Sequence, residues 1–101
     1  MNSKEHLLTC IIEEAAEIQQ AATKALRFGL EDGYPGTDRT NADDLCKEIN
    51  DLVAVVELAE ESGIITKKHT LIDIEQKKAR VKEWMEYAIE TGALTQEQDN
   101  E

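Results

Sequence analysis

The chain has 101 residues and a formal net charge of −11, with 22 acidic and 11 basic residues. A chain of this length forms one domain with a small core, so association with a second copy would bury more apolar surface. No basic stripe is present to displace counterions from a polyanion, and we predict no nucleic-acid partner. The N-terminal residues are polar and no apolar run approaches membrane-spanning length, so we expect a cytoplasmic protein with no membrane partner.

The composition favours an all-α fold, because aromatic residues make up only 4% of the chain and there is a single proline. Apolar residues recur at helical spacing in three segments, and we predict helices over residues 3–28, 41–62 and 70–91. Residues 1–92 are expected to form the domain and residues 93–101 a polar, disordered tail. The predicted inner faces comprise Leu8, Ile11, Ala15, Ile18, Ala22 and Leu26, then Leu45, Ile49, Leu52, Val53, Val56 and Ala59, and finally Ile74, Val81, Met85 and Ala88.

Capping residues and glycines set the predicted helix boundaries. Ser3 is the expected N-cap of the first helix, and the second helix is expected to start at Thr40 or Asn41. Between them, residues 29–40 hold three of the five glycines and the only proline, which predicts a loop. The third helix begins with Thr70 and Asp73, which resemble a capping box. Glycines follow each predicted helix and are expected to stop it, namely Gly29, Gly63 and Gly92.

The two cysteines, Cys10 and Cys46, do not form a CxxC pair or a secreted disulfide framework. Both fall in predicted helices beside apolar neighbours, and we expect reduced core residues. The two histidines, His6 and His69, are expected at the surface rather than as metal ligands.

Two acidic pairs carry the main functional signal. Glu14 and Glu17 stand three residues apart, so a helix projects both like charges from one face, and Glu48 with Asp51 repeats the spacing in the second helix. A short loop between two long helices predicts an antiparallel hairpin, in which residues at one height have sequence numbers with a constant total. The residue numbers of Glu14 and Asp51 have the same total as those of Glu17 and Glu48. The acidic pair of the first helix is therefore expected to lie at the same height as the acidic pair of the second. Four carboxylates at one height are ligands for a hard divalent cation such as Mg²⁺ or Mn²⁺.

The alternative interpretation of these acids is a solvated face on a very acidic protein. Carboxylates that border an apolar stripe are costly to desolvate unless they are paired or metal-bound, which favours the metal site. In the same register, Lys24 lies opposite Asn41, about 10 Å along the helix axis from the acidic pairs. The length of a nucleotide spans that separation.

The runs Glu13-Glu14-Ala15-Ala16-Glu17 and Glu48-Ile49-Asn50-Asp51 resemble the EExxE and ExxD signature of the MazG-like all-α nucleoside triphosphate pyrophosphohydrolases. The resemblance covers residues 5–62, and the stretches 24–29 and 40–41 look like the short phage-encoded members. It implies metal-dependent hydrolysis of nucleoside or deoxynucleoside triphosphates at the α-phosphate, giving a monophosphate and pyrophosphate, with a role in nucleotide-pool control. The gap between the two motifs is longer than is usual in the family, which leaves the role of the loop open.

Carried over to this sequence, the resemblance implies that Mg²⁺, or Mn²⁺ in its place, is held by Glu14, Glu17, Glu48 and Asp51. Either Glu14 or Glu17 would act as the catalytic base that orients the attacking water. The candidate substrate-binding residues are Lys24, Arg27, Asn41 and Lys78. Each also has a structural interpretation, because Lys24 and Arg27 lie near a helix end, Asn41 is a possible N-cap, and Lys78 belongs to a basic face.

A hairpin plus one helix leaves an apolar face open, so we expect a homodimer or homotetramer that completes four-helix bundles. A carboxylate-bridged di-iron bundle needs Glu-x-x-His motifs, and no histidine follows a glutamate at that spacing. The remaining alternative is a non-catalytic acidic helical module that binds a partner protein. That alternative predicts no metal-dependent thermal shift.

Overall fold

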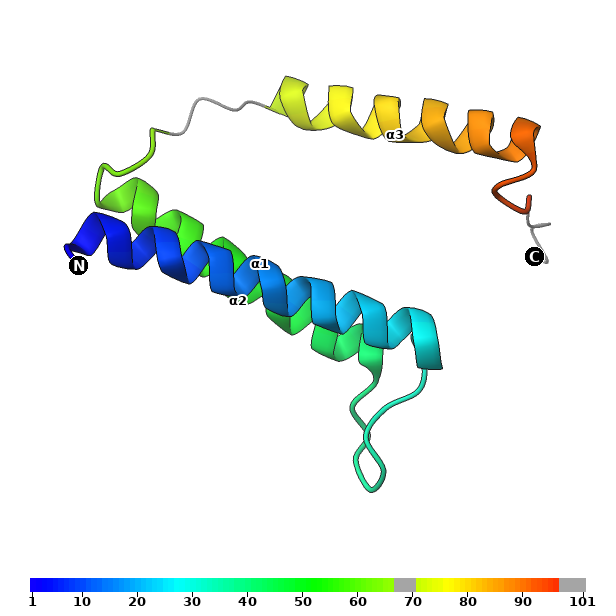
Figure 1. Cartoon of the computed structure of the whole chain (residues 1–101), viewed down its shortest axis with the longest axis horizontal. Helices are drawn as coiled ribbons and strands as arrows, with labels where there is room; N and C mark the ends of the chain where they lie inside the picture. Colours follow the sequence, from blue (N-terminus) through cyan, green and yellow to red (C-terminus); the bar gives the residue numbers. More distant parts are fainter. Residues whose placement is uncertain (67–70, 97–101) are drawn as a thin grey trace. The chain divides into compact units, whose positions relative to one another are not determined.

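The computed structural model describes residues 1–66 and 71–96, which fall into two compact units. The first unit holds α1 (Ser3–Phe28) and α2 (Asn41–Glu61), and the second holds α3 (Leu71–Thr91). The described residues contain no strand, only a single bridge between Gly33 and Thr40, so the all-α prediction is confirmed. In the first unit α1 and α2 lie side by side in opposite directions and form the expected hairpin (Figure 1). No helix in residues 1–66 or 71–96 has both the length and the hydropathy needed to cross a membrane.

The N-cap of α1 is Asn2, so the prediction of Ser3 was wrong by one residue. The Asn2 side-chain oxygen accepts a 2.8 Å hydrogen bond from the Glu5 N–H, and Glu5 Oε1 accepts one of 3.2 Å from the Asn2 N–H. Asn and Ser cap helices about equally well, and a Glu three residues after Asn2 completes the capping box. At the other end Gly29 stops α1 as predicted, with a φ of 99° that glycine adopts without strain.

The N-cap of α2 is Thr40, the first of the two predicted starts. The Thr40 hydroxyl accepts a 3.1 Å hydrogen bond from the Asp43 N–H, and Asp43 Oδ2 accepts one of 2.9 Å from the Thr40 N–H. The bond from the Thr40 N–H to the Asp43 carboxylate, and after it a hydrogen bond of that carboxylate with the Thr40 side chain, hold the pKa of Asp43 below its ordinary value. Asn41 is therefore the first residue inside the helix rather than its cap.

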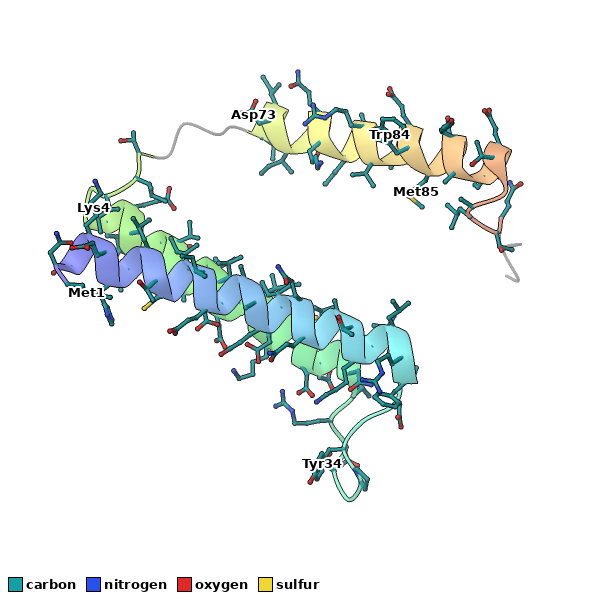
Figure 2. The ribbon with its side chains drawn as sticks, viewed as in Figure 1. Met1, Lys4, Tyr34, Asp73, Trp84 and Met85 are labelled. Atoms are coloured by element: carbon teal, nitrogen blue, oxygen red, sulfur yellow. The ribbon has the colours of Figure 1, made fainter. Side chains whose placement is uncertain are left out.

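The loop of residues 29–40 is closed against the start of α2 by backbone hydrogen bonds. The Asn41 N–H donates to the Asp32 carbonyl over 2.6 Å, and the Ala42 N–H donates to the Leu30 carbonyl over 3.0 Å. The loop projects beyond the ends of both helices, and Tyr34 at its tip is exposed (Figure 2). These bonds fix the crossing from α1 to α2, and with it the register of the hairpin.

The seam between α1 and α2 is built from small side chains. Ala25 and Ala59 are its buried apolar residues, and no large side chain of the described residues is fully buried. Of the predicted inner faces, the half-buried members are Ile11, Ala15, Ile18, Leu45, Leu52 and Val56. The prediction was wrong for five residues that are exposed, namely Leu8, Ala22, Leu26, Ile49 and Val53. A single partner helix covers only a narrow seam of an apolar stripe that is wide enough for two neighbours.

The second unit is α3 and the turn that follows it. Gly92 stops the helix as predicted, with a φ of 83°, and the Leu94 N–H donates a 3.0 Å hydrogen bond to the Ala88 carbonyl. Within this unit Ala88 is half-buried, whereas the other predicted inner residues of α3 are exposed. The predicted capping residue Thr70 and the tail residues 97–101 lie outside the described residues.

Both cysteines are free. Cys10 is half-buried, with its sulfur 3.7 Å from His6 Nε2, and His6 is exposed as expected. Cys46 is exposed, so its prediction as a core residue was wrong. It follows Leu45 in sequence but lies about 100° further around the helix, outside the seam.

Candidate metal centre

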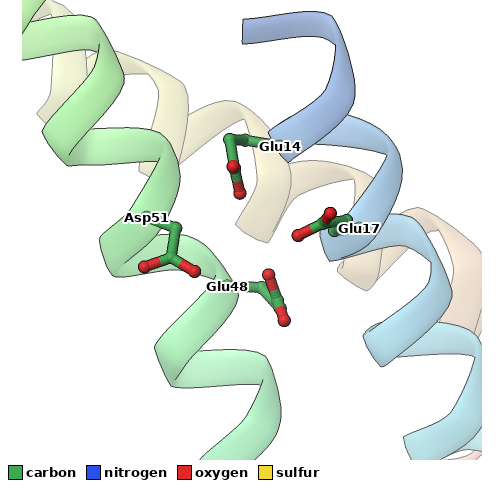
Figure 3. Close-up of side chains that lie close together, drawn as sticks. All are labelled: Glu14, Glu17, Glu48 and Asp51. Atoms are coloured by element: carbon green, nitrogen blue, oxygen red, sulfur yellow. The ribbon is translucent and has the colours of Figure 1, made fainter. Parts of the chain in front are cut away.

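The hairpin brings the four predicted ligands together. α1 supplies Glu14 and Glu17, and α2 supplies Glu48 and Asp51, which we call the acidic cluster (Figure 3). One carboxylate oxygen from each residue lies within 4.8 Å of the corresponding oxygens of the other three. The two acidic pairs are therefore level in the hairpin, as their sequence numbers predict.

Two carboxylate oxygen atoms inside the acidic cluster are shielded from water and have no hydrogen-bond partner among the described residues. Both atoms, Glu14 Oε2 and Glu48 Oε2, are buried. Glu14, Glu48 and Asp51 are half-buried, whereas Glu17 is exposed. Buried polar atoms are normally hydrogen-bonded, because an unsatisfied one forfeits its hydration. A bound cation would satisfy both oxygens.

Crowding of the carboxylates raises the pKa of Glu48. Its pKa is raised above the ordinary 4.5, first by a hydrogen bond with the Glu17 carboxyl group and next by partial desolvation. Repulsion from Glu17 and Asp51 acts in the same direction, and the positive charge of Lys47 opposes it. Close like charges favour the protonated form of one of them.

Lys47 contacts the acidic cluster, although it was not among the residues predicted from the sequence. Its ammonium lies 2.7 Å from Asp51 Oδ2 and 3.8 Å from Glu48 Oε1. The hydrogen bond to Asp51 raises the pKa of Lys47. The spacing of four residues between Lys47 and Asp51 on one helix would have predicted this pair.

A cavity of about 440 Å³ adjoins the acidic cluster on the side nearer the loop. Its lining includes Glu17 and Glu48, together with Lys24 and Asn41, so the structure places these two candidate substrate residues beside the acids. Gln20, Ala21 and Asp44 complete the lining. The cavity therefore has the composition expected of a site for the polar part of a ligand.

Asn41 is the one buried polar residue of the described chain, at 5% exposure. Its side-chain amide donates a 2.9 Å hydrogen bond to the Gly29 carbonyl, which joins the start of α2 to the end of α1. Its interpretation as an N-cap was wrong, because Thr40 fills that position. This structural role is compatible with contact between Asn41 and a ligand in the cavity.

The candidate substrate residue Arg27 does not line this cavity. Arg27 lines a second hollow of about 470 Å³ on α1, which shares Gln20 and Lys24 with the first. Its guanidinium carbon lies 4.9 Å from the centre of the Phe28 ring. Lys78 belongs to α3, in the other unit, and its ammonium pairs with Glu75 over 3.1 Å. A third hollow, of about 480 Å³, lies between the start of α1 and the end of α2 and includes no residue of the acidic cluster.

The fold and the site together define an all-α hairpin that gathers four carboxylates from two helices. Comparisons of the chain with protein-family models, curated proteins and solved structures find no match. The family resemblance of the two acidic motifs therefore remains a prediction, and the function is inferred from the geometry of the site.

Proposed function

We propose that the protein is a Mg²⁺-dependent nucleoside triphosphate pyrophosphohydrolase of MazG-like type. It would convert nucleoside triphosphates, deoxynucleotides among them, to the monophosphate and pyrophosphate, and so control a cytoplasmic nucleotide pool in the manner of the short phage-type members. The observation that carries this proposal is the meeting of four carboxylates from two helices around buried oxygens that lack partners.

The acidic cluster fits a hard divalent cation. All four donors are carboxylate oxygens, the ligands that Mg²⁺ and Mn²⁺ prefer. Ligands about 2.1 Å from a Mg²⁺ ion are at most about 4.2 Å apart. The observed spread of 4.8 Å therefore requires only a small inward movement of the side chains. When bound, the metal would polarise the phosphoryl oxygen and lower the pKa of a water molecule.

The positions of the side chains suggest a role for each. Glu17 is exposed and borders both the acidic cluster and the adjoining cavity, so it is better placed than Glu14 to take a proton from the attacking water. Glu14 and Glu48 each hold a buried oxygen without a partner and suit the role of ligands. Lys24 lines the same cavity, and its ammonium would bind a phosphate oxygen of the substrate.

The proposal includes assembly into a homodimer or homotetramer. Large apolar side chains of the hairpin are exposed, and Ile12 and Leu26 reach 68% and 87% exposure. A second hairpin would cover these side chains in a four-helix bundle. Light scattering after gel filtration should give two or four times the chain mass of 11.3 kDa. A monomer at micromolar concentration would contradict the assembly.

The catalytic proposal is tested by single amide substitutions. Glu17→Gln and Asp51→Asn should each lower turnover by roughly a hundredfold or more while the helical circular dichroism is unchanged. Glu13→Gln is the matched control, because Glu13 is exposed, makes the same change of charge and lies outside the acidic cluster. Near-normal turnover in both cluster variants would remove the metal centre from the mechanism. A folded protein with neither turnover nor a metal-dependent thermal shift would support the alternative, an acidic module that binds a partner.

A further inference from the structure

Lys47 contacts the acidic cluster but has no role in the proposed hydrolysis. We propose that Lys47 is an internal counter-ion of the metal-free cluster, and that a divalent cation displaces its ammonium on binding. The exchange would set the cation concentration at which the site fills. This inference rests on the proposed metal centre and concerns its regulation.

Lys47 forms ion pairs with acids of only one helix of the hairpin. Its ammonium contacts Asp51 and Glu48, which are both on α2. Among the described residues, no ion pair reaches Glu14 or Glu17 on α1. The buried oxygens of Glu14 and Glu48 also remain without partners. Lys47 therefore neutralises part of the cluster and leaves its centre open to a cation.

The setting of this pair differs from that of other pairs on the protein surface. Among the described residues, the carboxylate of the Arg39–Asp44 pair is not part of a group of converging acids, whereas a carboxylate oxygen of Asp51 lies within 4.8 Å of oxygens from three other carboxylates. Removal of the ammonium would leave four negative charges without an opposing one. The loss should therefore destabilise the metal-free protein more than the loss of an ordinary surface pair.

Displacement of Lys47 has a low cost. Its side chain is 57% exposed, so the ammonium can move into water without crossing a packed region. A divalent cation between the four carboxylates carries twice the charge and interacts with both helices. The competing interpretation is that Lys47 stays on Asp51 Oδ2 and orients the other oxygen toward the metal, as a supporting hydrogen bond does.

The two interpretations predict opposite effects of Lys47→Met on metal affinity. Displacement predicts that the variant binds Mn²⁺ roughly two- to fivefold more tightly than the wild type in calorimetric titration. It also predicts a lower melting temperature without metal and an unchanged one at saturating Mn²⁺. Lys47→Arg, which keeps the charge, should restore near wild-type behaviour. Lys4→Met is the matched control: Lys4 is exposed in the first turn of α1 (Figure 2), about 15 Å along the axis from Glu14.

The outcomes separate this inference from the proposed function. Weaker Mn²⁺ binding by Lys47→Met, or binding equal to that of Lys4→Met, overturns the counter-ion role while the metal centre stands. Absence of Mn²⁺ binding by both the folded wild type and Lys47→Met overturns the metal centre and this inference together. Tighter binding by Lys47→Met alone supports both.

Discussion

The side-chain amide of Asn41 donates a 2.9 Å hydrogen bond to the carbonyl oxygen of Gly29. Gly29 ends α1 and Asn41 begins α2, so this one bond joins the two helices where the loop leaves and returns. Glu17 lies seven residues before Lys24 on α1 and Glu48 lies seven residues after Asn41 on α2, which is about two turns along each helix. The bond therefore helps to set the register on which the acidic cluster depends.

Replacement of Asn41 should destabilise the hairpin. Asn41→Ala removes a buried hydrogen bond and leaves the Gly29 carbonyl without its donor, which should lower the free energy of unfolding by about 1–3 kcal/mol. Urea denaturation measures this change. Asn50→Ala is the control, since Asn50 is an exposed residue of α2 and its loss should cost less than about 0.5 kcal/mol. Equal stability of the two variants would contradict a structural role for Asn41.

Neutralisation of Glu14 should stabilise the metal-free protein and impair metal binding. Glu14→Gln removes one of four crowded negative charges, so the melting temperature without metal should rise by about 2–5 °C. The same change removes a ligand and should weaken Mn²⁺ binding by roughly tenfold or more. Differential scanning fluorimetry with and without Mn²⁺ measures both effects. The neighbouring Glu13→Gln, at an exposed position, should leave the Mn²⁺-induced shift intact.

Without metal, the stability contributed by Glu48 should fall as the pH rises, whereas the stabilisation by Mg²⁺ should grow. The pKa of Glu48 is raised above 4.5 in the folded protein, chiefly by its hydrogen bond with Glu17, so folding favours proton uptake there. This stabilisation of the metal-free protein is complete below the unfolded pKa of about 4.5 and is lost as pH rises through the raised value. Metal binding needs the ionised carboxylates, so the Mg²⁺-induced rise in melting temperature should grow over the same interval.

Melting curves from mildly acidic to neutral pH, with and without Mg²⁺, test both trends. The pKa of Asp43 is lowered by its bonds to Thr40, so its own contribution is present above the unfolded pKa of 3.8 and is lost as pH falls through the lower folded value. Comparison of the wild type with Glu48→Gln separates the contributions of Glu48 and Asp43 to the pH dependence of stability, because the variant keeps the contribution of Asp43. A Mg²⁺-induced shift that does not change with pH would contradict the assignment.

The loop before α2 should tolerate no side chain at Gly33. A Cβ added there would overlap the backbone carbonyl of Arg39, across the bridge between Gly33 and Thr40. Gly33→Ala should therefore destabilise the protein by about 1–3 kcal/mol in urea denaturation. Asp38→Ala, an exposed change in the same loop, should cost less than about 0.5 kcal/mol. Wild-type stability of Gly33→Ala would show that the bridge does not restrain the loop.

The sequence predicts the hairpin and the acidic cluster because both depend on local signals. Gly29 ends one helix, Thr40 caps the next, and the closed loop between them leaves a single register in which the acidic pairs are level. Lys47 was not predicted, because the spacing argument for the metal centre concerned metal ligands and an ammonium group is not one. The i,i+4 rule applied to Asp51 identifies it directly.

The burial of apolar residues was predicted less well. Ala25 and Leu26 are adjacent and both apolar, yet Ala25 is 9% exposed and Leu26 is 87% exposed. Helical periodicity identifies residues that favour burial, but it does not say which partner covers them. In the hairpin α2 covers only one seam of α1. The remaining apolar residues are those that the proposed second copy would cover.

The central claim is that the hairpin is a metal-dependent pyrophosphohydrolase. The most direct test is the release of pyrophosphate from a panel of ribo- and deoxyribonucleoside triphosphates, measured with Mg²⁺, with Mn²⁺ and with chelator. We predict metal-dependent release with the monophosphate as the second product, at a rate that Glu17→Gln abolishes and Glu13→Gln preserves. Absence of release across the panel, from a folded protein that also shows no thermal shift with either metal, would contradict the claim.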